Sequence, residues 1–151
     1  MRRITTAALA SLFILPAIAG AQSAEDILEA RQGFMKMLSL NMAPLAAMAK
    51  GEMPYDEAAA SLAAANIEAL SGYAAAGLFT PGTANGEVED SDALPAIWEK
   101  PEQFAQEYAA LGEAAAGASE AVKGGQGNIG PVLQKLGGAC KDCHDDFRKP
   151  Q

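Results

Sequence analysis

Two cysteines and the single histidine of this 151-residue chain lie within five consecutive residues, Cys140-Lys141-Asp142-Cys143-His144. Residues three apart on a helix share a face, so both thiols would meet one edge of a flat ligand. Thiols in this arrangement can add to the two vinyl groups of haem, and the adjacent imidazole can bind its iron. The spacing predicts one covalent haem c, with thioether bonds at Cys140 and Cys143 and His144 as proximal iron ligand.

Three other uses of this segment are weaker interpretations. A thioredoxin-like redox pair is expected beside a βαβ unit, and no segment of this chain is predicted as a strand. A structural zinc site needs four ligands, so one would have to come from outside the two cysteines and one histidine. A disulfide across three residues would be cramped and would leave His144 without a role. Haem attachment uses all three side chains.

Helices are the elements that we expect to position this motif, because the chain is rich in Ala, Leu, Glu and Lys and is punctuated by Gly and Pro. One domain fits the length and the 50% hydrophobic content. We predict helices at about 24–50, 56–76, 101–122 and 128–147, with a long connection at 77–100. These elements predict an all-α, antiparallel four-helix bundle, an architecture that builds cofactor sites from facing helices.

Particular residues set the expected helix ends. Asp56 is a plausible N-cap, and Pro101 suits the first position of the third helix. Gly51 and Gly77 are expected to end the first and second helices. Pro44 is expected to bend the first helix, because its ring removes a backbone hydrogen bond.

The first 21 residues have the pattern of a cleaved signal peptide. Arg2 and Arg3 precede an apolar run from Ala7 to Ile18, and Ala19-Gly20-Ala21 offers a small-residue cleavage site. The apolar run is shorter than the roughly 20 residues that span a bilayer, and no later segment is predicted to span one. We therefore predict an exported domain at 22–151, located in the bacterial periplasm, where signal cleavage and covalent haem attachment occur together.

Loss of Arg2 and Arg3 with the signal would change the formal net charge from −8 to −10. A charge this negative excludes nucleic acid as an expected partner, because phosphate binding needs basic patches. It favours encounter with a basic surface on a partner protein. We therefore expect redox proteins or a diatomic gas as partners.

Across nearly all of residues 22–151 the chain resembles the class II cytochromes c, the family of cytochrome c-prime and the low-spin cytochromes c-556. The position of Cys-x-x-Cys-His near the C-terminus distinguishes this family from the class I cytochromes. Other matching segments are Arg31-Gln32-Gly33-Phe34-Met35-Lys36, Lys50-Gly51-Glu52-Met53-Pro54-Tyr55-Asp56, Pro81-Gly82-Thr83, Pro95-Ala96-Ile97-Trp98 and the run from Leu133 to Arg148.

The resemblance implies haem between the helices and, frequently, a homodimer through the first helix and its neighbour. It implies that Met35 faces the distal side of the iron and that Arg31 and Gln32 lie near a haem propionate. It further implies that Asp92 lines the pocket and that Arg148 lies near the proximal histidine. Arg31 and Met35 are four apart and share a helix face. Periodicity alone would place Met35 in the core and Arg31 in solvent.

Two functions are compatible with these residues. We favour an electron carrier, in which the Met35 sulfur binds the iron opposite His144, because a His/Met pair raises the reduction potential. The alternative is a gas-binding protein of the cytochrome c-prime type, with nitric oxide or carbon monoxide at an open distal position. We do not expect an enzyme, because the single histidine is assigned to iron and no other is left to activate a nucleophile.

Overall fold

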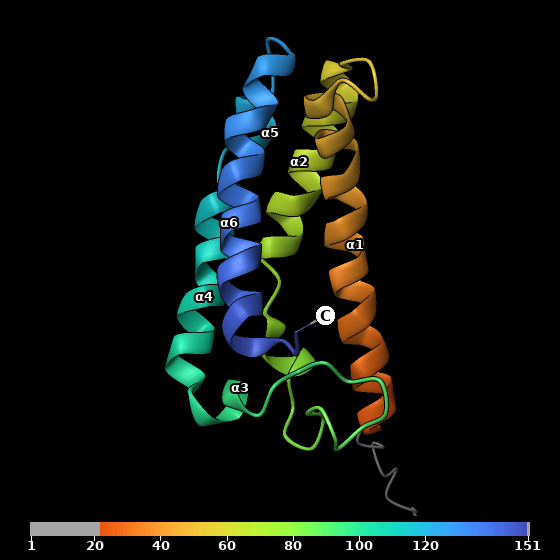
Figure 1. Ribbon diagram of the computed structural model, residues 1–151, viewed down its shortest axis with the longest axis vertical. Helices are drawn as coiled ribbons and strands as arrows, with labels where there is room; N and C mark the ends of the chain where they lie inside the picture. The colour runs from red at the N-terminus through yellow and green to blue at the C-terminus, as the bar shows by residue number, and fades with distance from the viewer. Residues whose placement is uncertain (1–21, 151) are drawn as a thin grey trace, which may run out of the picture.

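The computed structural model describes residues 22–150, so the predicted signal peptide lies outside the described residues. Its long helices run alternately in opposite directions and form an antiparallel four-helix bundle, as predicted (Figure 1). They are α1 (Ala24–Lys50), α2 (Glu57–Ser71), α4 (Pro101–Ala115) and α6 (Ile129–Phe147). Residues 22–150 also contain short turns of helix: η1 (Ala75–Leu78), α3 (Ala96–Glu99), α5 (Ala118–Ala121) and η2 (Gln126–Asn128).

Several helix ends follow from local chemistry as expected. Ser23 precedes α1 and forms a capping box with Asp26, which satisfies two backbone N–H groups at the start of the helix. Gly51 ends α1 in the left-handed conformation, with φ of 74°. The Asp56 carboxylate accepts the Ala59 N–H at 3.0 Å, and Pro101 is the first residue of α4.

Two predicted helices are wrong in their extent. The second ends at Ser71 and not at Ala76, because the Ser71 hydroxyl bonds the Glu68 carbonyl and Gly72, a poor helix former, caps the helix. The third, predicted to Val122, is divided into α4 and α5. Gly117 has a φ of 73°, which no α-helix continues through. The first helix has its predicted extent, since α1 continues through Pro44 to Lys50.

The core fills the bundle where the helices pack closely. Helix α1 packs against α2 and α6, and α4 packs against α2 and α6. Small side chains on α2 and α4, such as Ala60, Ala64 and Ala115, are completely buried and let the backbones approach. The largest completely buried apolar side chains are Leu45, Met48, Ile67, Val122, Ile129 and Leu136.

The long connection between α2 and α4 runs across one end of the bundle (Figure 1). Its backbone is bonded to the end of α6, where Leu94 N–H donates to the Phe147 carbonyl at 2.9 Å. Within the connection, the Trp98 indole N–H donates to the Phe79 carbonyl at 3.0 Å. Within residues 22–150, we find no helix with the length and hydrophobicity needed to span a membrane.

Met48→Ala is predicted to lower the free energy of unfolding by about 2–5 kcal/mol, because it opens a cavity at a completely buried position. Met53→Ala removes the same atoms from a side chain that is 40% exposed in the turn after α1, and should cost less than about 1 kcal/mol. Denaturant unfolding of both variants measures the difference. Equal costs would contradict this description of the core.

Candidate functional site

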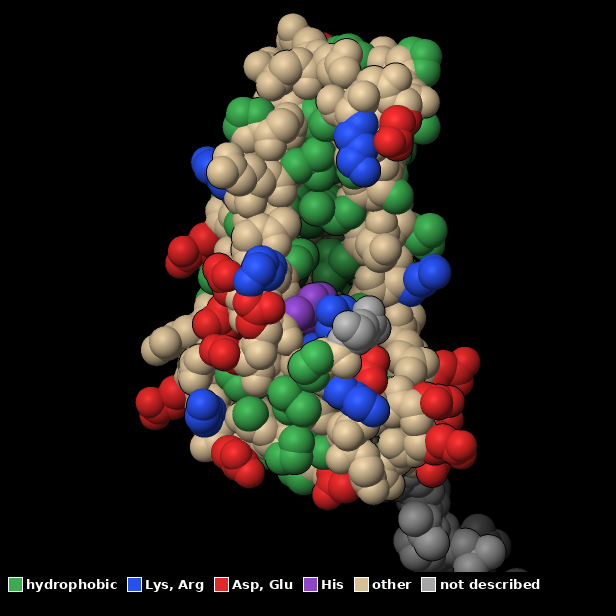
Figure 2. All heavy atoms as spheres, in the orientation of Figure 1, with side chains coloured by type: hydrophobic (Ala, Val, Ile, Leu, Met, Phe, Trp, Pro, Cys, Tyr) green, Lys and Arg blue, Asp and Glu red, His purple; other side chains and the backbone are tan. Residues whose placement is uncertain are grey.

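A cavity of about 600 Å³ lies between α1, α4, α6 and the long connection. Figure 2 shows it as a hollow with hydrophobic side chains inside and the histidine at its edge. All eight residues predicted for the site line this cavity: Arg31, Gln32, Met35, Asp92, Cys140, Cys143, His144 and Arg148. Its volume is within the range of cofactor sites in proteins.

Helix α6 presents the two cysteines and the histidine to the cavity. All three side chains are half-buried, and the cysteines are free thiols. Burial raises the pKa of Cys143 to about 11, with Glu107 adding to the effect. Burial also raises the pKa of Cys140. These thiols lack the low pKa of a reactive redox pair, which argues against the thioredoxin-like interpretation.

His144 is electrically suited to bind a metal. Burial is the main cause that lowers its imidazole pKa, and the positive charge of Arg148 lowers it further. The ring is therefore neutral at pH 7, which is the state that donates a nitrogen lone pair to iron. Among residues 22–150 no three His, Cys, Asp or Glu side chains are grouped to hold a metal ion, so the zinc interpretation gains no support.

Arg31 is buried, contrary to the solvent position that periodicity alone would give it. It is 6% exposed, and burial lowers its pKa. Its guanidinium donates to the Leu78 carbonyl at 2.8 Å, the Thr83 carbonyl at 3.2 Å and the Thr83 hydroxyl, and lies 4.6 Å from the centre of the Phe79 ring. Arg31 therefore joins α1 to the long connection at the cavity wall.

Arg148 is the second cation at the cavity. Its Nε atom is buried and has no hydrogen-bond partner within the described part of the chain. Neither Arg31 nor Arg148 forms an ion pair with a described acidic side chain. A buried, unpaired donor is costly unless a ligand supplies the acceptor. The unpaired Nε–H of Arg148 therefore fits a ligand that has carboxylates, as haem does.

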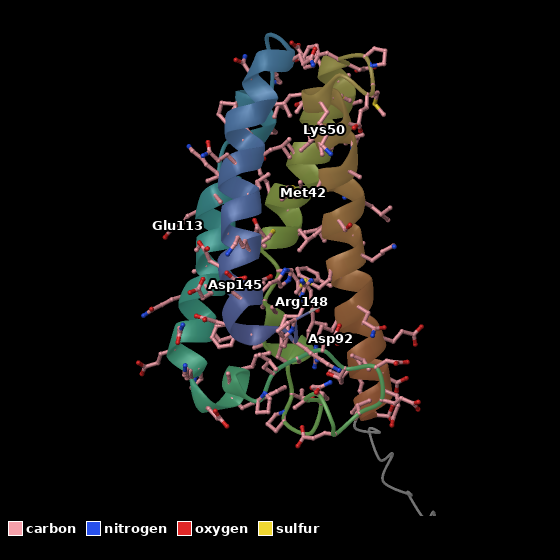
Figure 3. The ribbon with its side chains drawn as sticks, viewed as in Figure 1. Met42, Lys50, Asp92, Glu113, Asp145 and Arg148 are labelled. Atoms are coloured by element: carbon pink, nitrogen blue, oxygen red, sulfur yellow. The ribbon has the colours of Figure 1, made fainter. Side chains whose placement is uncertain are left out.

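The remaining predicted residues lie at the rim of the cavity. Gln32 is exposed and its amide donates to the Asp90 carbonyl at 3.3 Å. The Asp92 carbonyl accepts from the Lys149 N–H at 2.8 Å. Figure 3 shows Asp92 and Arg148 at the same end of the bundle.

Several wall residues were not among the predicted site residues. Phe79, Phe104 and Phe147 form an aromatic series, with ring centres 4.8 Å and 5.3 Å apart. Phe104 and Tyr108 are four apart on α4, and this spacing in the sequence places both side chains on the same face of the helix. Phe79 follows a 3₁₀ turn and has no periodic signal. Met42, two turns after Met35, also lines the cavity.

These residues fit a covalently bound haem. The apolar and aromatic walls suit the macrocycle, the unpaired Arg148 donor suits its carboxylates, and α6 offers two thiols and a neutral imidazole on one face. A four-helix bundle with this site defines a c-type haem protein. The family model described as Cytochrome C' matches residues 26–148, so the chain belongs to the cytochrome c' family.

Individual relatives agree with this assignment. The chain is 43% identical to a cytochrome c' of Cereibacter sphaeroides over 148 residues, covering 98% of each chain. It is 42% identical over 151 residues to a cytochrome c-554 of the same organism, covering 99% of each chain. It is thus a haem cytochrome, with one covalently attached haem c per chain.

Solved structures have the same architecture. Cytochrome c' from Rhodobacter Spheriodes has a TM-score of 0.82 and 42% identity, over 86% of this chain and 100% of that chain. A nitric oxide complex of a cytochrome c prime variant from Alcaligenes xylosoxidans has a TM-score of 0.71 and 29% identity, over 84% and 97%. A cytochrome c' described as having ligand-controlled dimer dissociation has a TM-score of 0.77 and 26% identity, over 87% and 100%.

Proposed function

We propose that this protein is a cytochrome c' that binds a diatomic gas, nitric oxide or carbon monoxide, at an open distal position. In this proposal Cys140 and Cys143 form the thioether bonds and His144 is the proximal ligand. The observation that supports it best is that the matching family model and similar solved structures are cytochromes c', one of them a nitric oxide complex. The Met35 side chain is partly buried and packs against the core cluster of the bundle, which includes Phe34 and Leu38 of α1.

The comparisons are the reason to prefer this function to the electron carrier that the sequence favoured. The matching family model and several similar structures have the name cytochrome c', and one similar structure is a nitric oxide complex. Met35 lines the cavity from α1, and a methionine at this position restricts the space for a ligand. It contributes no nitrogen or oxygen donor to the distal side.

When bound, the haem supplies an iron that accepts a diatomic ligand and changes oxidation state. The chain performs the remaining tasks. The aromatic and aliphatic walls exclude water, which strengthens electrostatic interactions within the site. The positive charges of Arg31 and Arg148 attract carboxylates to the cavity. The low pKa of His144 keeps its imidazole free of a proton that would compete with iron.

The His/Met electron carrier remains as a second candidate. Met35 lines the same cavity as His144, and its thioether is a chemically competent iron ligand. One relative is named cytochrome c-554 and not cytochrome c', although its 42% identity to this chain is nearly that of the cytochrome c' from the same organism, 43%. Redox partner proteins belong to this candidate, and the acidic surface predicted from the sequence would favour basic partners.

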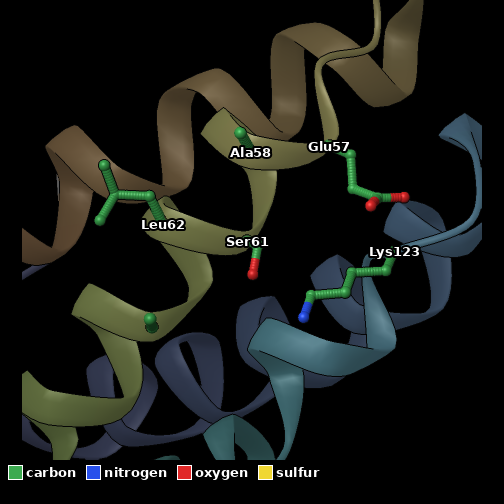
Figure 4. A pocket seen from close by; sticks show the side chains of 6 residues that line it. Glu57, Ala58, Ser61, Leu62 and Lys123 are labelled. Carbon is green, nitrogen blue, oxygen red and sulfur yellow. The ribbon is translucent and has the colours of Figure 1, made fainter.

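We also propose that residues 1–21 are a signal peptide that directs the chain to the bacterial periplasm, and that the protein forms a homodimer. Exposed hydrophobic side chains on α1 and α2 support the dimer: Leu40 and Leu62 are 62% and 63% exposed. The Asn66 side-chain amide donates to the Asn41 side-chain oxygen Oδ1 at 2.9 Å, so these parts of α1 and α2 are neighbours. Figure 4 shows Leu62 on α2 among the side chains that line a pocket, with Glu57, Ser61 and Lys123.

Replacement of both cysteines by serine (Cys140→Ser with Cys143→Ser) is expected to abolish the covalent haem, because a hydroxyl does not form the thioether. Mass spectrometry of the denatured protein measures the attached haem. Ala139→Ser adds a hydroxyl beside Cys140 and should retain the haem mass. Retention of that mass in the double variant would contradict the assigned attachment.

The optical spectrum of the oxidised protein is expected to be high-spin, because the proposal leaves the iron without a strong distal ligand. Met35→Ala should leave the spectrum high-spin and increase the affinity for carbon monoxide by about tenfold or more, since it removes crowding of roughly 1.4 kcal/mol. Met42→Ala, at a second methionine of the cavity, is the matched control and should have a smaller effect. A low-spin spectrum that Met35→Ala abolishes would instead establish the electron carrier.

Leu40→Glu is expected to convert the dimer to monomer, because it places a charge in the apolar contact. Sedimentation measures the change. Met53→Glu introduces the same charge at another exposed side chain, in the turn after α1, and should leave the dimer intact. If the unmodified protein sediments only as a monomer, the dimer proposal is wrong.

A further inference from the structure

The Arg31 side chain contacts two ends of one segment of the long connection. At residue 78 its Nε–H donates to the Leu78 carbonyl at 2.8 Å. At residue 91 its Nη1–H donates to the Ser91 hydroxyl at 3.4 Å. The backbone carbonyl and hydroxyl of Thr83, between these ends, also accept from the guanidinium. A single side chain of α1 therefore gathers residues that are up to 13 positions apart in the connection.

These contacts are buried and form a closed set. Thr83 and Ser91 are each 1% exposed, and the Ser91 hydroxyl donates to the Thr83 carbonyl at 2.8 Å. Arg31 is surrounded by neutral oxygen acceptors and the Phe79 ring, with no described carboxylate paired to it. Dipoles of the connection therefore replace the water that the buried charge has lost. Removal of one member therefore takes a buried hydrogen-bond partner from the others.

The far end of the same segment is bonded to α6. The Ala93 and Arg148 backbones form a bridge, and the Lys149 N–H donates to the Asp92 carbonyl at 2.8 Å. Phe79, Asp90, Asp92 and Ala93 line the cavity. Residues 78–94 thus contact α1 through Arg31 at one side and the helix of His144 at the other. We call residues 78–94 the strap.

We infer that Arg31 is a positioning residue that fastens the strap to α1 and so holds α1 and α6 in register at the end of the cavity. The inference rests on the proposed function only in taking this cavity as the haem site. Met35 lies one helical turn after Arg31, so the strap fixes the distal side chain relative to His144. This role is additional to any contact between Arg31 and a haem carboxylate.

Hydrogen exchange of the haem-loaded protein tests the fastening directly. The reporters are two strap amides: Asn85 N–H, which donates to the Ala93 carbonyl at 2.7 Å, and Leu94 N–H, which donates to Phe147. Ser91→Ala and Arg31→Met should each speed their exchange by about tenfold or more, since buried hydrogen bonds are lost. Ser39→Ala is the control, because Ser39 lines the cavity on α1 and has no described bond to the strap.

A double-mutant cycle distinguishes coupling from general loosening. If Arg31 acts through the strap, the effects of the two substitutions should not multiply. The strap amides of the Arg31→Met/Ser91→Ala variant should then exchange much more slowly than the product of the two single-variant rate increases predicts. If Arg31→Met does not fold, Thr83→Val takes its place, because the Thr83 hydroxyl also accepts from Arg31. Multiplicative effects, or unchanged exchange at Asn85 and Leu94, would overturn the inference.

The exchange experiment can support or overturn the inference independently of whether the proposed function is correct. The spin state of the iron and the covalent haem mass decide ligation and attachment, and neither enters the exchange measurement. A role of Arg31 limited to a haem carboxylate predicts that Arg31→Met alters the haem spectrum while strap exchange remains that of the unmodified protein. That outcome would also overturn the inference.

Discussion

A flat ligand enters a helical bundle only where two helices that pack tightly elsewhere remain apart. Helix α1 packs tightly against its neighbours along one part of its length and remains apart from them along another. Near its C-terminus Leu45 and Met48 are completely buried among neighbouring helices, whereas Arg31 and Met35, nearer its N-terminus, line the cavity. The tight part supplies the hydrophobic stabilisation, and the open part has to be maintained by other contacts. The long connection, with its bonds to α1 and α6, provides them.

Electrostatics imposes a second requirement on the open part. The cavity is largely apolar, and charged groups in it are costly unless they have partners. Arg31 obtains partners from the backbone and hydroxyl groups of the connection, while the Nε atom of Arg148 has none within residues 22–150. The two cations are therefore not equivalent. One is satisfied by the protein itself, and the other retains a donor for a ligand.

Much of the site was predictable because its chemistry is local in the sequence. Cys140, Cys143 and His144 are assigned by spacing alone, and the capping residues Gly51 and Asp56 act on their own helix. The end of α2 and the break at Gly117 were missed because both depend on short-range competition that helical periodicity does not report. The burial of Arg31 could not be predicted from spacing, since its partners lie about 50 residues away.

The location of the proposed attachment residues, Cys140 and Cys143, in the last helix has a consequence for assembly. Cys140 follows α1, α2 and α4 in the sequence, so attachment at this residue would require a chain that already possesses three of its four long helices. The same helix contributes Ile129 and Leu136, which complete the core. A chain shortened before residue 140 would lack both anchors and the iron ligand. With attachment at these residues, covalent haem would mark chains that extend through α6.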